Sequence, residues 1–562
     1  MRGVFQCKWH RGARMRAVRT VVICATAFAL GQTGAPQMAL SQTLNDGFAA
    51  MEDGDFFTAF SAMRRLEQAG DPNAARLLEQ VFRTPSVQPV AAPAMPVATY
   101  RRPAPAQVPP SGLSPVAVAP PPAVRAPVAS GRPAPPVPPH TLPAPLTGMD
   151  FHHPDPGLAS IGRLLFFDPV LSGNKDTSCA TCHHPRHASG DGVSLGLGTG
   201  AQGLGRDRSP TGARAAQRRI PRNAPALWNL GARDIRVLFH DGRVELDPVR
   251  PGHLLTPQGP LDYMALETLL AAQALFPVLS AEEMAGKPGE NPIADAVAAE
   301  RVHGDDGAWA LLAARVDALE PYNTAFAAWR GAPGAVRIEE IANALGAFIA
   351  REFRADQTPF DLYLRETGAM PPEAGEGMRL FYGRANCAAC HSGPLLSDQQ
   401  FHAMGQPPLG PGKDRDAEGY TRDLGRGFVT LDPDDAYRFR TPMLRNVVHT
   451  GPWGHSGAFS DLADFLRHHL DPVTGLAAYA PQAILPDLEV ADSDYAAIAN
   501  ARARAAIADA AARDMALRPQ VILQDDEIAL LIAFLATLSD QTALAGRSGV
   551  PASVPSGLMV DQ

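Results

Sequence analysis

Hydrophobic residues recur at helical spacing along much of the chain, whereas the strict alternation typical of strands is scarce. The clearest periodic segments are 338–354 (IEEIANALGAFIAREFR), 462–470 (LADFLRHHL) and 526–538 (DEIALLIAFLATL). Apolar residues three or four positions apart form one hydrophobic stripe on a helix. Long connections rich in glycine and proline separate these segments. The pattern predicts a mainly α fold.

Residues 1–41 have the pattern of a signal peptide. Six basic residues and no acidic residue lie there, an apolar run spans 20–30, and Ala39-Leu40-Ser41 resembles a cleavage site, with Ala35 as an earlier option. The apolar run is short for a membrane span. We expect export to the periplasm and no membrane span after cleavage; an uncleaved anchor is the alternative.

Two further segments precede the globular part of the chain. Residues 42–83 carry Ala and Leu at helical spacing around a turn at 70–72, which predicts a short helical hairpin similar to one tetratricopeptide or Sel1-like repeat. The hairpin is either a docking module or a simple pair of leader helices. Residues 84–148 are rich in Pro, Ala and Val and predict a disordered linker. This linker is a spacer or, alternatively, a segment that a proline-binding partner recognises.

Composition and charge limit the class of protein. The 562 residues, 45% of them hydrophobic, suffice for two or three domains with cores of their own. The net charge is −8, and because residues 1–41 contribute six positive charges, the remainder carries −14. Such a surface does not favour nucleic acid or an anionic membrane, and it suits a basic partner protein.

The cysteines indicate the chemistry. Cys7 and Cys24 lie within 1–41, and the other four form two CxxCH motifs, at 179–183 and 387–391. Two thiols at this spacing add to the vinyl groups of a haem, and the following imidazole binds its iron. The corresponding residues are Cys179, Cys182, His183, Cys387, Cys390 and His391.

Two other uses of paired cysteines fit less well. A zinc ribbon has its second pair about 15–20 residues after the first, whereas these pairs are far apart. A thioredoxin-like pair needs no histidine next to it. We therefore predict two covalently bound haem c groups in two mainly α, cytochrome c-type domains, 149–365 and 366–545, followed by a tail, 546–562.

Several motifs, in this order, resemble those of the bacterial di-haem cytochrome c peroxidase and MauG family. They lie within about 155–540 and comprise LLFFDP at 164–169, PRNAP at 221–225, DGR at 241–243, the second CxxCH, LRNV at 444–447 and HSG at 455–457. The resemblance implies that the N-terminal haem domain holds a peroxide site. It implies that the C-terminal haem transfers electrons.

The resemblance also implies a distal pocket above the first haem. The family has a Gln, a Pro four residues later and a Glu six residues after that, which here are Gln273, Pro277 and Glu283. A carboxylate in a partly apolar pocket can move a proton between the two peroxide oxygens, and a neighbouring amide can orient the peroxide. Without the resemblance, Gln273 and Glu283 would be read as ordinary helix-surface residues.

Family members also hold a calcium ion between the haems. By position, the resemblance assigns it to Asn223, Thr450 and Pro452, the last two through backbone carbonyls. Oxygen donors suit calcium, although a site with one side chain would depend heavily on water.

At the first haem the sequence departs from the peroxidases of the family. Those enzymes block the resting haem with a histidine about sixteen residues after the CxxCH histidine, and here that position is Thr199. The resemblance then implies an open, five-coordinate haem, as in MauG; His187, His253 or a rearranged loop are the alternatives. The loop also has GxGxxG spacing at 198–203, but no strand or βαβ unit encloses it, so we reject a dinucleotide site.

At the second haem the family's distal ligand lies fourteen residues after the His of HSG, with Met in peroxidases and Tyr in MauG. Here that position is His469, on the predicted helix 462–470. We expect two imidazole ligands, His391 and His469, and a low-spin iron of lower potential than His/Met ligation gives. His468 is the neighbouring alternative, about 100° around the helix, and both could instead be solvated.

Between the haems the family often has a tryptophan, and here that position is His240. Because imidazole is harder to oxidise than indole, electron hopping through His240 is not expected. Direct tunnelling or another aromatic residue, such as Trp453, would then carry the electron.

Four functions are compared. The first is a periplasmic di-haem peroxidase that reduces hydrogen peroxide, through a high-valent iron species, with electrons from a cytochrome c, a cupredoxin or an organic donor. The second is a MauG-like oxidase that modifies side chains of a partner protein. A dioxygenase similar to rubber oxygenases is more remote. A di-haem electron carrier is the non-enzymatic alternative.

Overall fold

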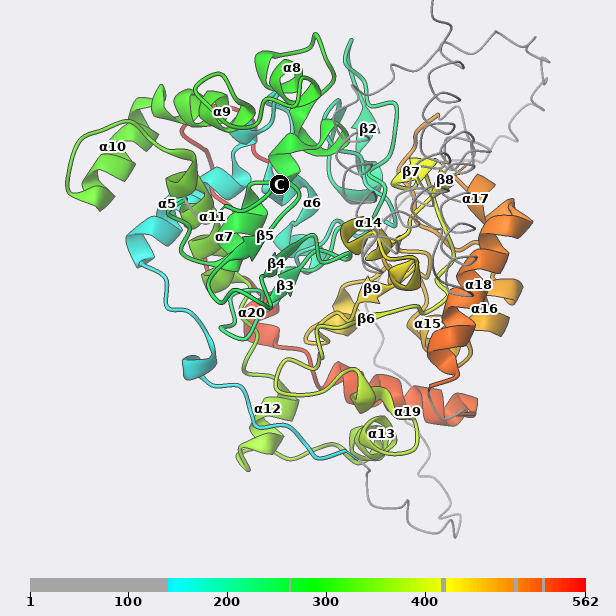
Figure 1. Ribbon diagram of the computed structural model, residues 1–562. Helices are drawn as coiled ribbons and strands as arrows, with labels where there is room; N and C mark the ends of the chain where they lie inside the picture. Colours follow the sequence, from blue (N-terminus) through cyan, green and yellow to red (C-terminus); the bar gives the residue numbers. More distant parts are fainter. Residues whose placement is uncertain (1–139, 262–263, 416–420, 490–493, 518–520, 562) are drawn as a thin grey trace, which may run out of the picture.

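The computed structural model describes residues 140–261, 264–415, 421–489, 494–517 and 521–561 (Figure 1). The predicted signal peptide, the helical hairpin and most of the predicted linker lie outside these residues.

Helices dominate the described residues, and the strands are two or three residues long, so the fold is mainly α as predicted. The α-helices are α5 Pro156–Phe167, α6 Cys179–Cys182, α7 Leu269–Ala274, α8 Pro292–Ala298, α9 Ala308–Asp317, α10 Glu320–Arg330, α11 Ile338–Glu352, α12 Pro359–Leu364, α13 Pro372–Tyr382, α14 Gly427–Thr430, α15 Leu462–Leu470, α16 Pro472–Ala478, α17 Ala496–Ala499, α18 Ala501–Met515, α19 Asp525–Ala536 and α20 Gln541–Leu544. The strands are β1 Ala201–Gln202, β2 Ser209–Pro210, β3 Val237–Leu238, β4 Val244–Leu246, β5 Leu254–Leu255, β6 Phe401–His402, β7 Asp414–Arg415, β8 Thr421–Arg422 and β9 Phe439–Arg440. They form small antiparallel sheets in the orders β1-β2, β3-β4-β5, β6-β9 and β7-β8.

The three helices with the clearest hydrophobic periodicity are confirmed. The segments 338–354, 462–470 and 526–538 correspond to α11, α15 and α19. At the start of α19, Gln524 and Glu527 form a capping box, which satisfies amide groups that the helix itself leaves unpaired.

One hydrophobic cluster forms where α5 crosses α11. Gly162 lies at the crossing, and a Cβ there would come within 1.8 Å of the Ala344 carbonyl oxygen, so only glycine permits this approach. Phe166 of α5 and Phe348 of α11 pack with ring centroids 5.0 Å apart. The first CxxCH motif therefore lies next to a tightly packed pair of helices.

A second cluster repeats this construction around α13 and α19. A Cβ on Gly377 of α13 would come within 1.9 Å of the Leu530 carbonyl oxygen of α19. Phe381 and Phe534 pack across the crossing with centroids 5.1 Å apart. In Figure 1 this pair lies below the rest of the molecule, well apart from α5 and α11. Each CxxCH motif thus accompanies its own pair of crossed helices.

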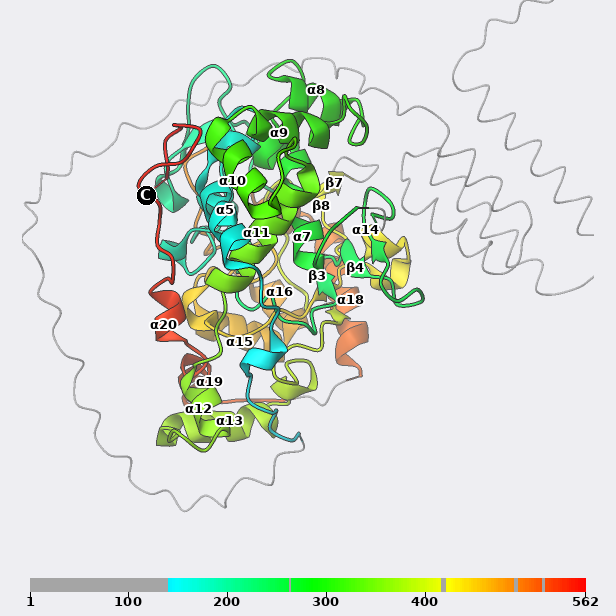
Figure 2. The same ribbon diagram turned by 90° about the vertical axis from the view of Figure 1, so that its left-hand side faces the viewer.

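The two clusters are nearly continuous in sequence. The first takes its buried residues mainly from 146–355, and the second takes them from 360–538. The described chain then returns: Ala543 and Val554 belong to the first cluster. Figures 1 and 2 show the end of the chain beside the helices of that cluster rather than beside α19.

Contacts hold both ends of the described chain on the globular part. The sequence predicted a linker and a tail at these positions. His140 donates its backbone N–H to the Tyr382 carbonyl, and Leu146 is buried. The linker prediction is therefore wrong for residues 140–148, because apolar burial and hydrogen bonds hold them on the globular part. At the other end, Thr181 Oγ1 donates to Asp561 Oδ2 over 2.6 Å.

No helix within the described residues is long and apolar enough to cross a bilayer.

Candidate functional site

The first CxxCH motif presents its three side chains from one short element. Cys179 and Cys182 begin and end α6, and His183 follows as its C-terminal cap. His183 Nδ1 lies 3.0 Å from the Ser189 carbonyl oxygen. Burial lowers the pKa of His183 and favours the neutral imidazole. With Nδ1 held by a carbonyl, Nε2 is the nitrogen that can ligate a metal.

The second motif repeats this arrangement. Cys387 opens a 3-10 turn, Cys387–Ala389, and His391 Nδ1 lies 3.0 Å from the Leu396 carbonyl oxygen. Burial lowers the pKa of His391 as well. Two motifs far apart in sequence therefore hold their histidines in the same tautomer by the same contact.

The thiols of both motifs sit in surroundings that disfavour their charged form. Burial raises the pKa of Cys179 and of Cys387 to about 12. The four cysteines form no disulfide. A zinc site needs thiolates, whereas a thioether to haem leaves the sulfur uncharged. The donor set thus suits covalent haem better than zinc.

A cavity of about 290 Å³ adjoins the second motif. Most of its lining is apolar, with the polar exceptions placed at particular points, as in cofactor sites. Residues that line it include Cys387, Cys390, His391, Leu462, Phe465, Leu466, His469, Met515, Val521, Leu531 and Leu535. The cavity therefore lies between the second motif and α15.

Helix α15 carries two neighbouring histidines, and one of the two lines this cavity. His469 lines it, and its Nδ1 lies 3.2 Å from the Phe465 carbonyl oxygen, as in the two motif histidines. His468 is 2% exposed, and its Nε2 lies 2.8 Å from the Met404 carbonyl oxygen. Burial lowers the pKa of His468 to about 4. The two side chains thus occupy different surroundings, and His469 is the one near His391.

A half-buried cation, Arg440, lines the same cavity. Arg440 donates to the carbonyl oxygens of Phe239 (3.1 Å) and Thr441 (3.2 Å), and no carboxylate within the described residues forms an ion pair with it. Burial lowers its pKa to about 10. A cation that is shielded from water and has no anion beside it is unfavourable. A haem carries two propionate carboxylates, so its binding here would supply the missing charge.

The three residues that the resemblance assigns to calcium all line this cavity. They are Asn223, Thr450 and Pro452. Asn223 Nδ2 donates to the Val193 carbonyl over 2.8 Å, which fixes the orientation of the amide. The structure thus brings the three residues to the cavity beside the second motif.

The three predicted distal residues follow one another through a compact turn. Gln273 is in the last turn of α7, Pro277 opens a 3-10 turn, and Glu283 sits in a π-helical turn, Ala281–Ala285. Isolated π turns are frequent at functional sites. Ser280 Oγ accepts from the Glu283 backbone N–H over 3.3 Å.

Glu283 is half-buried and electrostatically coupled to the first motif. Burial raises its pKa, and the charges of Arg243 and Lys413 offset part of that rise. After burial itself, the charges of Asp191 and Glu283 are the largest influences that raise the pKa of Cys182. A carboxyl group with a raised pKa near a CxxCH motif can act as an acid or a base.

Thr199 occupies the position at which peroxidases of the family that the sequence resembles have a histidine. Its side chain is hydrogen-bonded to another side chain. It is 8% exposed, and its Oγ1 donates to Asp176 Oδ2 over 3.1 Å. His187 packs against the glycine-rich loop 196–205: a Cβ on Gly205 would lie 3.1 Å from His187 Nε2. His253 lies in the hairpin between β4 and β5. A 3-10 turn, not a helix, follows the GxGxxG spacing.

His240 and Trp453 both line the cavity beside the second motif. His240 Nε2 is 3.1 Å from the Asn223 carbonyl oxygen, and burial lowers the pKa of His240 to about 3, so the ring is neutral. Trp453 Nε1 donates to the Val447 carbonyl over 2.9 Å.

The PRNAP and DGR motifs meet through charges that sequence reasoning missed. Arg222 pairs with Asp241 over 2.6 Å and with Asp423 over 2.6 Å. The motifs were visible in the sequence, but Asp423 lies outside all of them. This network joins the two halves of the chain beside the cavity.

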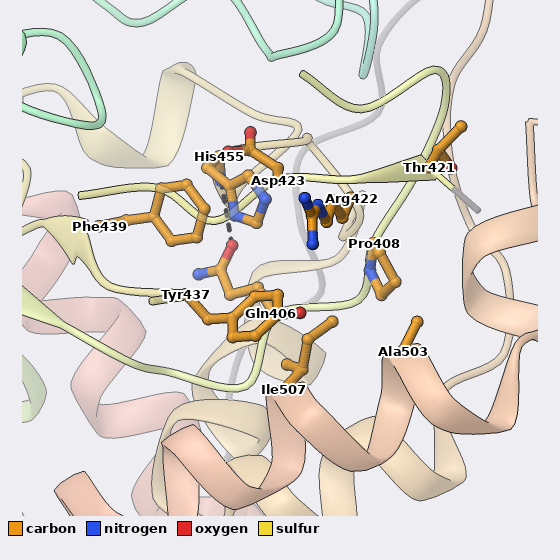
Figure 3. A pocket seen from close by; sticks show the side chains of 10 residues that line it. All are labelled: Gln406, Pro408, Thr421, Arg422, Asp423, Tyr437, Phe439, His455, Ala503 and Ile507. Atoms are coloured by element: carbon orange, nitrogen blue, oxygen red, sulfur yellow. Dashed lines mark hydrogen bonds between the residues drawn. The ribbon is translucent and has the colours of Figure 1, made fainter. Parts of the chain in front are cut away.

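His455 of the HSG motif connects the cavity to a smaller pocket of about 20 Å³ (Figure 3). Its ring stacks on Phe439 at 3.7 Å, and its backbone N–H donates to Gln406 Oε1 over 3.0 Å. The three residues line both spaces. The HSG motif thus forms part of the wall between them.

Cys390, Asp398 and His402 form a further cluster, with candidate ligand atoms within 4.8 Å of one another. His402 Nε2 lies 2.9 Å from Asp398 Oδ2, and this hydrogen bond is the main cause that raises the pKa of His402 to about 9. A protonated imidazole cannot ligate a metal. The cluster therefore favours an imidazolium–carboxylate pair over a metal site.

Comparisons with known proteins agree with these features. A sequence model of the family described as "Di-haem cytochrome c peroxidase" matches residues 156–369. The chain is 28% identical over 335 residues to the methylamine utilization protein MauG of Methylorubrum extorquens. The aligned region covers 59% of this chain and 71% of that protein. It is 29% identical over 307 residues to the cytochrome c551 peroxidase of Pseudomonas aeruginosa, covering 54% and 69%.

Two solved structures match the chain over most of their own length. A MauG-like protein associated with microbial copper homeostasis is 24% identical with a TM-score of 0.46, covering 73% of this chain and 96% of that one. The diheme peroxidase BthA from Burkholderia thailandensis is 19% identical with a TM-score of 0.44, covering 76% and 98%.

Proposed function

The chain belongs to the di-haem cytochrome c peroxidase and MauG family of haem oxidoreductases, and on that premise we propose that it is a periplasmic peroxidase that reduces hydrogen peroxide. The observation that carries the proposal is the inequality of the two sites. At the second site a further histidine, His469, lines the same cavity as His391, whereas at the first site Thr199 is hydrogen-bonded to Asp176. A site whose iron has no second protein ligand, beside a carboxyl group, suits a reaction. A site whose iron has two protein ligands suits electron transfer.

The residues fit two covalently attached haem groups in two domains, 149–365 and 366–545. Haem supplies, when bound, an iron that takes peroxide and exchanges electrons. Cys179, Cys182 and His183 would hold the first. The residues for the second would be Cys387, Cys390, His391 and His469, with Arg440 against a propionate. Each motif has its own hydrophobic cluster, which supports this division.

Glu283 moves the proton in this proposal. Reduction of peroxide needs a proton taken from one oxygen and delivered to the oxygen that leaves as water. The raised pKa of Glu283 brings its carboxyl group nearer to the pH at which it can do both. Gln273 orients the peroxide through its amide, and Pro277 shapes the turn between these two residues.

Electrons reach the first site from the second and, beyond it, from a cytochrome c, a cupredoxin or an organic donor. His240, neutral and bonded to the Asn223 carbonyl, is a poor hopping station. Trp453 lines the cavity beside it and supplies the indole that this position lacks. A calcium ion on Asn223, Thr450 and Pro452 would fix the distance between the two halves.

Electron paramagnetic resonance of the resting ferric protein tests the proposal. We expect one high-spin signal from the first site and one low-spin signal from the second. Rapid mixing of this diferric protein with peroxide should bleach its absorption without prior reduction. Two low-spin signals and no reaction would identify an electron carrier instead.

A MauG-like oxidase that modifies a partner protein is the second candidate. The second site offers His469 where peroxidases of the family have methionine, and a MauG is among the similar proteins. Such an enzyme would change the mass of a co-expressed partner in the presence of peroxide. A peroxidase would leave all partner masses unchanged.

A further inference from the structure

The glycine-rich loop 196–205 is built around one buried guanidinium. Arg208 is 3% exposed and donates to the carbonyl oxygens of Leu197 (2.6 Å), Gly198 (2.7 Å) and Gly203 (2.9 Å). Its fourth hydrogen bond goes to Thr177 Oγ1 (3.1 Å). No carboxylate of the described residues forms an ion pair with it. Burying an arginine costs free energy, which these hydrogen bonds and the charges of Asp561, Asp176 and Asp191 offset.

The loop that Arg208 holds touches the backbone of Glu283. The Thr199 N–H donates to the Glu283 carbonyl oxygen over 3.0 Å. A Cβ on Gly198 would lie 2.1 Å from the Glu282 carbonyl oxygen and 2.7 Å from Glu283 Cα. The two segments are therefore in direct contact, and Gly198 is the residue that permits it.

The other end of the same guanidinium reaches the first CxxCH motif. Thr177, its fourth acceptor, lies two residues before Cys179. Asp176 adds a second link, because its Oδ2 accepts from the Thr199 Oγ1 (3.1 Å) and from the Gly200 N–H (2.8 Å). One buried side chain thus links the segment that leads to the cysteines with the loop that contacts the Glu283 backbone.

We propose that Arg208 is a positioning residue that sets the place of Glu283 relative to the first motif through the carbonyls of Leu197 and Gly198. The inference rests on the proposed role of Glu283 as the proton carrier. Lysine cannot replace Arg208, because one ammonium cannot span four separate acceptors as a planar fork does.

A double-mutant cycle on the haem-loaded protein tests this role, with the second-order rate of the peroxide reaction as readout. We expect Glu283→Gln to lower the rate by about 10²–10⁴-fold. Arg208→Gln and Arg208→Lys should each lower it by about 10–100-fold, with haem content and the high-spin signal of the first site retained. In the Glu283→Gln background, Arg208→Gln should cost less than about threefold more, because both changes remove the same contribution.

Arg330→Gln is the matched control. Arg330 also holds a loop, donating to the carbonyls of Gly334 and Ala335 and to Glu340, but between α10 and α11. It should lower stability and leave the rate unchanged in both backgrounds. Gly198→Ala provides a second approach if Arg208 variants fold poorly, because its Cβ displaces Glu283 while Arg208 stays intact.

The outcomes separate the two proposals. If wild-type protein does not react with peroxide, or if Glu283→Gln reacts normally, the proposed function is wrong. If Glu283→Gln is slow but Arg208→Gln and Gly198→Ala react like wild type, or lose the same factor in both backgrounds, the positioning role is wrong.

Discussion

At the scale of single residues, backbone carbonyls decide which histidines can serve a metal. His183, His391 and His469 each have Nδ1 near a carbonyl oxygen, at 3.0, 3.0 and 3.2 Å. His468, the direct neighbour of His469, uses Nε2 instead. Since such contacts fix the tautomer, three histidines are prepared for ligation through Nε2 and one is not.

Replacing His469 should change the second haem and leave the first unaffected. His469→Met gives His/Met ligation, which raises the reduction potential of that haem by on the order of 0.1 V, within the roughly 0.8 V that axial ligands cover. A potentiometric titration followed by absorption measures the change. His468→Gln is the control, and a shift of the same size in that variant would contradict the assignment.

The pH dependence of the peroxide reaction should respond to Arg243. Burial raises the pKa of Glu283, and Arg243 is the largest influence that lowers it again. Arg243→Gln should therefore raise this pKa further. If the carboxylate must accept the proton first, the rate falls on the acidic side of that pKa, and this limb moves to higher pH in the variant. Rates measured from pH 4 to 9 check the direction, and an unmoved limb would exclude Glu283 as the titrating group.

At the scale of elements, two helix crossings with a central glycine support the two CxxCH motifs. The crossings join α5 to α11 and α13 to α19, and each leaves no room for a methyl group. Backbone contact this close fixes how the two helices of each pair are oriented. It thereby also fixes the position of the motif that follows α5 or α13 in the chain.

A methyl group at the second crossing should destabilise the protein. Gly377→Ala places a Cβ 1.9 Å from the Leu530 carbonyl oxygen, and overpacking of this kind costs about 1–3 kcal/mol. Gly375→Ala in the same helix meets only Met370 Cγ at 3.7 Å, so it should cost nothing or stabilise slightly. Urea unfolding of both variants measures the free energies; equal losses would show that the crossing is not the cause.

Much of this architecture could be predicted from the sequence, and the limits have physical causes. The amphipathic segments gave α11, α15 and α19 nearly to the residue, because long periodic patterns are strong signals. The CxxCH motifs have a fixed spacing that chemistry demands. Three of the four hydrogen-bond partners of Arg208 are backbone carbonyls, which no sequence pattern reveals. The π turn at Glu283 depends on the loop packed against it, again a tertiary contact.

At the scale of the whole molecule, the segment after α20 joins the second half of the chain to the first. Arg163 donates to the Gly549 carbonyl over 3.0 Å, and Ser556 Oγ donates to Asp168 Oδ1 over 2.6 Å. Val554 is 6% exposed within the first cluster. The predicted tail is therefore part of the core.

Removing apolar contact from this segment should destabilise the first cluster. Val554→Ala deletes about two methylene equivalents, which at about 0.8 kcal/mol each costs about 1.5 kcal/mol before any cavity cost. Met559 is 78% exposed, so Met559→Ala should leave stability unchanged. Thermal unfolding monitored at the first haem compares the two, and equal melting temperatures would contradict a structural role for the segment.

The residues of this segment are synthesised last. Synthesis runs from the N-terminus, so Val554 of the first cluster and Asp561, which accepts a hydrogen bond from Thr181, emerge only after all of α12–α20. Until then the first CxxCH motif lacks part of its cover. A nonsense mutation near the 3′ end of the gene would therefore remove contacts from the half of the protein that is encoded first.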